Sequence, residues 1–483
     1  MTGPADPRLF AGTAEGVDAL RSAVTATLDA VRPGVAARTE RSPKELADAL
    51  VDLDPCPEDG VPFADVVADL AERTWRHGVQ VAHPACAAHL HPPTLVSAAA
   101  TEVAIAATNQ SLDSWDQAPA ATQLELHLVS WLARRFGLPD GATGVVTSGG
   151  TASNLLGLTL ARDHLAARTG HDVRADGLPA GADRWRILAS EGAHFSIQRS
   201  AALLGLGHRA VVPVATDAAG RMRVDALEDE VQRLTDAGHP VLAIVATAGT
   251  TDLGAVDPID RIVPVAEAAA AWLHVDAAVG GAFVLSDQLR GLLDGIGGAR
   301  SITVDLHKLW WQPIGASVLL VSDPSAFDAM RTPSDYLDRP DDDASGVTNL
   351  VSRSLDTTRR FDAAKVVTSL RATGRRQLGA MLEHLAHLAT TAARAVDAEP
   401  GLDLMAEPTT VMCTFRWTGG GDDVEGTVQR RLLASGRAVI GRTKLDGRST
   451  WKLTFTDPTT SADEVRDLVR LIADEARIVA AGS

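Results

Sequence analysis

Lys308 is the residue of this chain whose surroundings best suit covalent chemistry. It stands in DLHKLWW (305–311), directly after the apolar run SITVD (301–305). An amine withdrawn from water beside tryptophans can stay neutral and form an imine with a carbonyl compound. Only five of the 45 basic residues are lysine, and the other four have more ordinary settings: Lys44, Lys365, Lys444 and Lys452.

A loop of small residues, TSGGTASN (147–154), follows a strand-like run and opens a helical stretch. Small side chains let the backbone approach a ligand, and the free amides and the dipole at the start of a helix attract an anion such as phosphate. No lysine follows the second glycine, so the loop is not a P-loop. By itself it is equally compatible with a tight turn and a Thr or Ser helix cap.

Asp276 ends the apolar run WLHVD (272–276), where a buried parallel strand is expected. A carboxylate there is costly unless a cation or a strong donor pairs with it, although a cap of the strand or of the next helix would also explain it. Together these features match the groups of pyridoxal 5'-phosphate. The loop suits the phosphate, the buried carboxylate suits the pyridine nitrogen, and a lysine shielded from water suits the aldehyde. We therefore expect this cofactor.

The elements that position these residues alternate along the chain. Short apolar runs separated by amphipathic helical stretches predict strands at 144–148, 185–190, 240–247, 272–278, 301–305 and 316–322. This alternation is typical of a mainly parallel sheet covered on both faces, with ligands at the carboxyl ends of the strands. A helical lead at about 15–75 precedes the sheet. A long helix at 361–397, a strand at 409–417 and a last helix at 461–481 predict a smaller α+β domain, and the acidic run 341–343 predicts an exposed loop.

Five segments together carry a resemblance to a known family. TSGGTASN, EGAHFSIQRSA, ATAGTTDLGAVDPI, HVDAAVGG and VDLHKLWWQP, in this order, resemble the group II pyridoxal-phosphate-dependent amino-acid decarboxylases from about His83 to the C-terminus. The resemblance implies an α/β fold of type I, like aspartate aminotransferase, with a large domain built on a mainly parallel sheet and a small α+β C-terminal domain. We expect a helical segment at 1–100 that wraps a second subunit, a cofactor-binding domain at 101–370 and the small domain at 371–483.

The same resemblance implies roles for single residues. Lys308 is the residue that binds the cofactor covalently, Asp276 partners the pyridine nitrogen, and His194 stacks on the ring and acts in catalysis. The further cofactor contacts that it implies are Thr151 and Ala152 for the phosphate, Thr247 and Ala278 beside the ring, and His307 as a second catalytic histidine next to the lysine.

Four segments resemble most closely the bacterial branch that acts on the diamino acids 2,4-diaminobutyrate or lysine. They are AHLHPPTL (88–95), NQSLDSWDQAPAATQLE (109–125), HKLWWQP (307–313) and SLDTTRRFDAAK (354–365). A second, cationic amine on the substrate favours an acidic pocket, for which Asp113 and Asp116 are candidates, with His89 and His91 beside them. Helix caps are an equal alternative for the two aspartates. Lys452 matches a position where related enzymes hold the substrate carboxylate with arginine, against the alternative of a surface charge.

The protonation step and the product stay open at this point. Better-known relatives carry a loop tyrosine shortly before the segment matched by SLDTTRRFD, where this chain has TNLV (348–351), and its one tyrosine, Tyr336, lies earlier. Val279 stands where many relatives have Tyr or Trp. An aldehyde-forming oxidative deaminase, a decarboxylase of aromatic, acidic or aliphatic amino acids, and a non-catalytic scaffold are the alternatives.

Composition narrows the partners. A net charge of −17 argues against an extended nucleic-acid or anionic-membrane surface, and no stretch approaches the apolar length of a membrane span. Three cysteines without C-x-x-C spacing indicate neither a disulfide framework nor a structural metal site, and they favour a reducing, cytoplasmic setting. We expect an amino-acid substrate, no metal, and a homodimer with shared active sites, as the resemblance implies.

Overall fold

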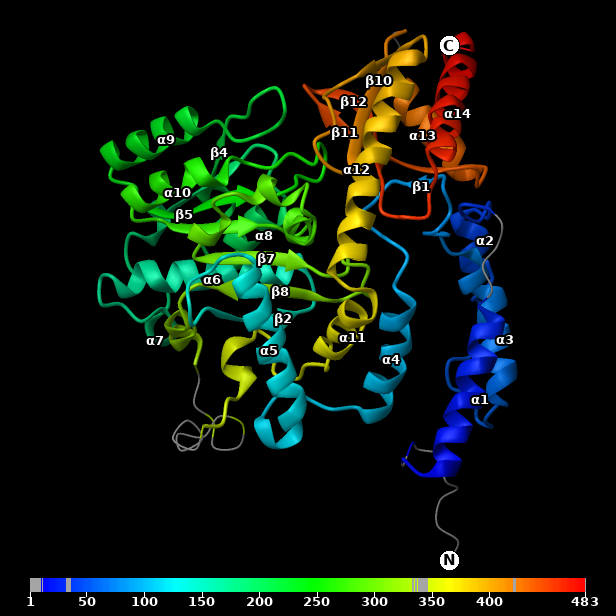
Figure 1. Cartoon of the computed structure of the whole chain (residues 1–483), viewed down its shortest axis with the longest axis horizontal. Helices are drawn as coiled ribbons and strands as arrows, with labels where there is room; N and C mark the ends of the chain where they lie inside the picture. The colour runs from blue at the N-terminus through cyan, green and yellow to red at the C-terminus, as the bar shows by residue number, and fades with distance from the viewer. Residues whose placement is uncertain are drawn as a thin grey trace, which may run out of the picture.

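The structure, a computed structural model, describes residues 10, 12–31, 36–331, 334, 337, 346–419 and 423–482. Its centre is a seven-stranded sheet with the order β2-β8-β7-β6-β5-β3-β4 (Figure 1). The strands are β2 (Thr143–Thr147), β3 (Arg186–Ser190), β4 (Val211–Val214), β5 (Val241–Thr247), β6 (Trp272–Asp276), β7 (Ser301–Asp305) and β8 (Ser317–Val321). The six strands expected from the sequence are thus confirmed. β4 was not expected because Pro213 interrupts its apolar run. A proline is tolerated there because β4 lies at the edge of the sheet.

The direction of the strands decides where a site can form. β4, β3, β5, β6 and β7 are parallel, whereas β8 is antiparallel to both β7 and β2. Two reversals restore the direction, so β2 runs parallel to β7. The carboxyl ends of all strands except β8 therefore meet at one edge of the sheet.

Helices cover both faces of this sheet and form two separate cores, as expected for strands that are apolar throughout. Val145 points into one core and Val146 into the other, because successive side chains of a strand alternate. α6 (Gly150–Ala167) and α8 (Ser196–Leu203) share the core of Val145. The helices on the opposite face are α5 (Pro119–Arg135), α9 (Val224–Asp236) and α10 (Ile259–Ala268).

The C-terminal part builds a second sheet beside the first. Its order is β1-β11-β12-β10-β9, with β9 (Leu402–Leu404), β10 (Met412–Trp417), β11 (Val439–Leu445) and β12 (Arg448–Thr454). β1 (Cys86–Ala87) joins it in parallel to β11, so a piece of the N-terminal third contributes an edge strand. The helical pattern expected at 361–397 is divided into α11 (Ala363–Thr373) and α12 (Arg375–Ala398) at Gly374, whose φ of 79° suits glycine. Four further helices are α4 (Val96–Thr108), α7 (Val173–Asp176), α13 (Val424–Ala434) and α14 (Ala462–Ala481).

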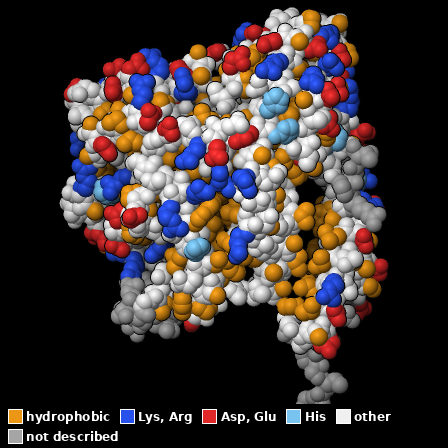
Figure 2. Space-filling view, in the orientation of Figure 1, with side chains coloured by type: hydrophobic (Ala, Val, Ile, Leu, Met, Phe, Trp, Pro, Cys, Tyr) orange, Lys and Arg blue, Asp and Glu red, His pale blue; other side chains and the backbone are white. Residues whose placement is uncertain are grey.

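An N-terminal arm stands along one side of the molecule (Figure 1). It consists of α1 (Ala14–Ala30), α2 (Pro43–Asp48) and α3 (Phe63–Arg73), and α1 contains no buried residue. Hydrophobic side chains gather on the arm in the space-filling view (Figure 2). Within the described ranges, no helix has the length and apolarity needed to cross a membrane. Tyr336 and the acidic run 341–343 lie outside the described residues.

Buried ion pairs fasten the segments around the large sheet. Arg359 Nη1 donates to both carboxylate oxygens of Glu125, at 2.8 and 3.0 Å, and to the carbonyl of Val146 at 3.1 Å, while Glu125 accepts the amide of Val146. Lys365 lies on a helix as expected, but its side chain is fully buried between Glu102 and Asp362, which the sequence does not indicate. The pair of Arg359 and Glu125 joins α5 and the segment before α11 to β2, and the pair of Lys365 and Glu102 joins α4 to α11.

Replacing Glu125 with leucine tests the first of these pairs. Glu125→Leu leaves the guanidinium of Arg359 buried without its partner, and breaking such a pair costs about 3 kcal/mol or more. We expect a lower urea midpoint, measured by circular dichroism. Lys44→Gln, which removes an exposed ion pair with Asp48, serves as the control and should change stability by less than about 1 kcal/mol. Equal midpoints for the two variants would contradict the role of Glu125.

Candidate active site

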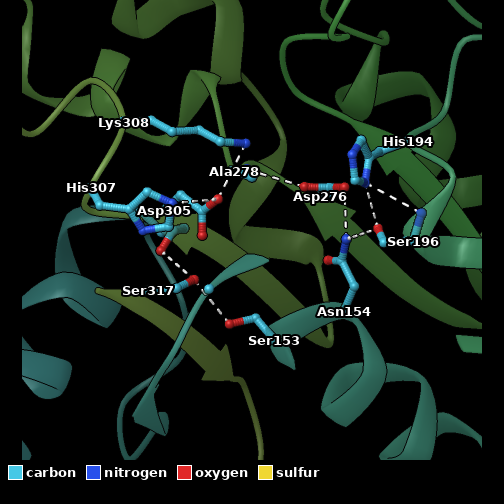
Figure 3. A network of polar contacts seen from close by, with 12 residues as sticks. Ser153, Asn154, His194, Ser196, Asp276, Ala278, Asp305, His307, Lys308 and Ser317 are labelled. Carbon is cyan, nitrogen blue, oxygen red and sulfur yellow. Dashed lines mark hydrogen bonds and ion pairs between the residues drawn. The ribbon is translucent and has the colours of Figure 1, made fainter. Parts of the chain in front are cut away.

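A cavity of about 410 Å³ opens at the edge where the strands end. The first turn of α6 lines it on one side. Asp276, Asp305 and Lys308 line it from the ends of the strands and the turns after them (Figure 3). The residues that line it are Ser148, Gly149, Gly150, Thr151, Ala152, Asn154, His194, Thr247, Gly249, Thr251, Asp276, Ala278, Val279, Asp305, His307, Lys308 and Ile314. The structure thus brings together Thr151, Ala152, His194, Thr247, Asp276, Ala278, His307 and Lys308, the whole cofactor set predicted from the sequence.

Lys308 lies in the turn after β7, three residues beyond the end of the strand. Its Nζ is 3.2 Å from Oδ2 of Asp305, and its side chain is 21% exposed. Trp310 and Trp311 are buried in the core and are not among the residues that line the cavity. The surroundings of the amine are therefore more polar than the sequence suggests, with a carboxylate as its nearest charged neighbour.

Asp276 ends β6 and is 5% exposed. Its Oδ2 accepts a hydrogen bond from Asn154 Nδ2 at 2.8 Å, and its Oδ1 accepts one from the amide of Ala278 at 3.2 Å. Amide donors on both oxygens lower the cost of burying the carboxylate. A carboxylate held in this way can pair with a protonated nitrogen of a ligand in the cavity.

The start of α6 presents a cradle of backbone amides to the cavity, and Gly150 lets Asp305 lie against it. A Cβ built on Gly150 would lie 2.8 Å from Oδ2 of Asp305, so a larger residue forces Asp305 or the helix start to shift. The amides of Thr151 and Ala152 belong to the first turn, whose N–H groups have no partner within the helix. The next residue, Ser153, is tied to Thr147 and Ser317 through its hydroxyl, which anchors the helix start to the sheet.

Two residues that line the cavity also carry a buried polar atom without a partner. Thr247 Oγ1 and Asp305 Oδ1 are buried, and neither has a hydrogen-bond partner among the described residues. The backbone amide of Thr247 donates to Asp257 at 2.7 Å. Burial raises the pKa of Asp257 to about 6. The free amides of the helix start, the buried carboxylate of Asp276 and the amine of Lys308 together fit the phosphate, ring and aldehyde of pyridoxal 5'-phosphate.

Two histidines complete the predicted cofactor set. His194 Nδ1 lies 2.8 Å from Ser196 Oγ, and burial lowers the pKa of this imidazole, although the carboxylate of Asp276 opposes the shift. His307 Nδ1 lies 2.8 Å from the carbonyl oxygen of Ala316, and its Nε2 lies 3.9 Å from Asp305. His194 is therefore held neutral beside the cavity, and His307 is tied to the turn that carries Lys308.

The predicted substrate residues are less uniformly placed. Lys452 on β12 is buried, and its Nζ donates to the carbonyl of Thr251, a cavity residue, at 2.8 Å. Burial lowers the pKa of Lys452, against the opposing charge of Asp252. His89 and His91 do not line the cavity, but the charges of Lys452 and His307 act on them, and burial lowers the pKa of both.

Asp113 and Asp116 lie outside the cavity of this chain. Asp113 accepts hydrogen bonds from Ser111 and Thr358, and Asp116 accepts one from Ser114 at 2.5 Å. Neither aspartate forms the helix cap that the alternative interpretation of the sequence expects, because the helices that begin at Trp115 and Pro119 have no side-chain cap.

Four cavity or network residues were missed in the sequence. Asp305 and Asn154 stand inside motifs that were recognised, DLHK and TSGGTASN, but only the folded chain shows that their side chains face the cavity. Ser196 lies two residues after His194, a spacing that alone does not indicate a contact. Thr251 lines the cavity from within ATAGTTDLGAVDPI, a segment that carries the family resemblance but does not single out this threonine.

Gly150→Ala tests the cradle. The added methyl group meets the carboxylate of Asp305 and must displace either it or the helix start, so we expect the affinity for pyridoxal 5'-phosphate to fall about tenfold or more. Quenching of protein fluorescence during titration of the apoprotein measures this affinity. Gly291→Ala is the control, because a Cβ at Gly291 meets no atom within 4 Å. Unchanged affinity in Gly150→Ala would show that the cradle is not the phosphate site.

Comparison with known proteins agrees with this geometry. Residues 45–418 match the model of the pyridoxal-dependent decarboxylase conserved domain. The chain is 39% identical to an L-2,4-diaminobutyrate decarboxylase of Acinetobacter baumannii, over 91% of this chain and 88% of the relative, and 41% identical to one of Rhizobium meliloti, over 89% and 86%. A solved structure from Vibrio parahaemolyticus, the glutamate decarboxylase domain of a diaminobutyrate-pyruvate transaminase and L-2,4-diaminobutyrate decarboxylase, superposes with a TM-score of 0.87 at 36% identity, covering 97% of this chain and 96% of that one. The chain therefore belongs to the pyridoxal-dependent decarboxylase family, and its fold is that of the type I pyridoxal-phosphate enzymes.

Proposed function

We propose that this decarboxylase acts on L-2,4-diaminobutyrate and releases carbon dioxide and 1,3-diaminopropane. The observation that carries the proposal is the similarity to two bacterial L-2,4-diaminobutyrate decarboxylases along nearly the whole chain. Pyridoxal 5'-phosphate, when bound, supplies an electron sink for the pair of electrons left by the departing carboxyl group. The three unpaired cysteines support a cytoplasmic location.

The proposed roles of the cavity residues follow from their contacts. Lys308 would bind the cofactor covalently, and Asp276 would keep the pyridine nitrogen protonated, because its two amide donors hold it as an acceptor in a buried place. The first turn of α6 would bind the phosphate. His194, neutral and beside Asp276, would stack on the ring.

Lys452 is the proposed cation for the α-carboxylate of the substrate. Its buried amine reaches the carbonyl of Thr251 at the cavity wall, 2.8 Å away. A lysine offers a single point of charge, whereas arginine binds a carboxylate through two parallel hydrogen bonds. Weaker binding of this group suits a reaction in which the carboxylate leaves, since tight ground-state binding would oppose the step.

The second amine of the substrate would need an acceptor. Asp113, Asp116, His89 and His91 stay our candidates, and for the two aspartates the role depends on a shared site between two subunits. The carboxylates would accept hydrogen bonds from the ammonium group, which are stronger than those between neutral groups. Val279, buried in the cavity wall in place of an aromatic residue, leaves room for such a contact.

Product analysis tests the proposed reaction. We expect carbon dioxide release and 1,3-diaminopropane, identified by mass, from L-2,4-diaminobutyrate in a panel of single amino acids. Lys308→Ala should lose the yellow colour of the bound cofactor and the activity, whereas Lys444→Ala, at an exposed position on β11, should keep both.

Other results would select other functions. Release of carbon dioxide only from lysine or from an aromatic or acidic amino acid would replace the substrate. Aldehyde and peroxide with oxygen consumption would indicate the oxidative deaminase. A fully loaded protein without turnover on any amino acid would indicate the scaffold.

We further propose that the protein is a homodimer in which residues 1–100 wrap the partner and the large and small domains follow at 101–370 and 371–483. The support is the arm, where Leu28 is 65% and Phe63 is 53% exposed. A helix such as α1, without one buried residue, gains little stability alone in water. A contiguous apolar surface of this kind is typical of an interface.

Light scattering of the eluting protein tests the dimer. We expect a mass of two chains at micromolar concentration, and Phe63→Asp on α3 should shift the protein toward a single chain because it places a charge in the apolar contact. Ile478→Asp, at an exposed apolar position on α14, is the control. A monomeric wild type would contradict the proposal, and so would equal dissociation of both variants.

A further inference from the structure

A continuous network of hydrogen bonds runs from the core of the sheet to the two central residues of the cavity. Trp272 Nε1 donates to Ser301 Oγ, which lies 2.8 Å from His274 Nδ1. His274 Nε2 lies 3.0 Å from Asn154 Oδ1, and Asn154 Nδ2 donates to Asp276. The sequence makes room for the imidazole at Gly157, where a Cβ would lie 2.7 Å from Cε1 of His274.

Asn154 also branches toward the second cavity residue. Its Nδ2 donates to Ser196 Oγ at 3.0 Å, and this hydroxyl lies 2.8 Å from Nδ1 of His194 (Figure 3). An amide nitrogen has two hydrogens, so one reaches Asp276 and the other reaches Ser196. Asn154 and Ser196 are both buried.

The chemistry of the groups determines the direction of every bond. A carboxylate only accepts, so the amide nitrogen of Asn154 faces Asp276 and its oxygen faces His274. His274 then carries its proton on Nε2 and accepts at Nδ1 from Ser301, whose oxygen already accepts from the indole. Burial lowers the pKa of His274, which agrees with a neutral ring.

The same reasoning assigns the tautomer of His194. The backbone amide of Ser196 donates to Nδ1 of His194 at 3.3 Å, so Nδ1 is an acceptor and also receives the proton of Ser196 Oγ, whose oxygen accepts from Asn154. Nδ1 therefore has no proton. The proton of the neutral ring is on Nε2, which has no hydrogen-bond partner among the described residues.

We propose that Asn154 is a positioning residue that couples Asp276 to His194. It orients the carboxylate of Asp276 and keeps the proton of His194 on Nε2, at the cavity. The proposal concerns the cofactor site and does not depend on which amino acid is the substrate. Because Asn154 holds its place through His274 and Ser301, the orientation of the site is set in the core of the sheet.

Asn154→Asp tests the coupling at constant volume. In Asn154→Asp a carboxylate oxygen replaces the amide nitrogen that donates to Asp276, so two acceptors face each other. The hydroxyl of Ser196 then donates to this carboxylate and no longer to His194. We expect the affinity of the apoprotein for pyridoxal 5'-phosphate to fall about tenfold above neutral pH, and to recover in part at lower pH, where the two carboxylates can share a proton. The titratable and charged groups around this position and around His194 are Asp276, His274, His194, Asp305, Lys308 and Arg199.

Three comparisons keep the test specific. Asn154→Ala should lose affinity without the recovery at low pH, each variant being compared with wild type at the same pH. Asn109→Asp adds a carboxylate at an exposed helix end and should bind like wild type. Ser200→Ala, on α8 with a buried hydroxyl that has no partner among the described residues, controls for changes in the helix that carries Ser196. Thermal unfolding of each apoprotein monitors the fold.

The nitrogen-15 signals of the His194 ring provide a second readout, independent of activity. We expect a neutral ring protonated at Nε2 in the wild type and in Ser200→Ala, and a growing share of the Nδ1 tautomer in Asn154→Asp. The proposal is overturned by wild-type affinity of Asn154→Asp above neutral pH, by a loss of affinity that is the same at all pH values, or by a wild-type ring protonated at Nδ1.

Discussion

A carboxylate at the end of a buried strand must be supplied with donors, and much of this site follows from that need. Asp276 lies in the middle of an apolar sheet, where an unpaired charge would be expelled or neutralised. The amide of Ala278 and the side chain of Asn154 meet it from two elements, the turn after β6 and α6. Asn154 in turn needs partners for its remaining atoms, which requires His274 on one side and Ser196 on the other. A single buried charge thus accounts for a polar network through an otherwise apolar layer.

The two carboxylates of the cavity differ in the cationic groups that lie near them. Two carboxylates, Asp276 and Asp305, stand at neighbouring strand ends, yet only Asp305 lies beside the amine of Lys308. The amides at the start of α6 add a positive potential without adding a mobile charge. An anionic group can therefore bind next to Asp305, because the helix and the lysine offset the carboxylate, while Asp276 stays available for a cationic ring nitrogen.

The lysines show how tertiary structure separates residues that the sequence treats alike. Lys365 and Lys452 are both buried, but Lys365 is closed in by Glu102 and Asp362, whereas Lys452 reaches a cavity residue, Thr251. In the first arrangement two carboxylates pair with the ammonium group of Lys365, so the role of this lysine is structural. In the second arrangement a carbonyl takes one of the three donors and the carboxylate of Asp252 lies 3.7 Å from Nζ, so a donor is left for a substrate carboxylate.

The sequence by itself indicated six of the seven strands of the large sheet, the loop of small residues that opens α6, Asp276 and Lys308, because each depends on local order: an apolar run, a helix start, and a polar residue directly after a strand. It could not determine that β8 runs antiparallel, that Cys86–Ala87 joins the C-terminal sheet, or that the tryptophans next to Lys308 point into the core. The network of Asn154, Ser196 and His274, and the placement of Asp113 and Asp116 outside the cavity, were also decided only by the tertiary structure. These features depend on which distant side chains meet after folding, and the spacing of residues along one chain contains no record of such contacts.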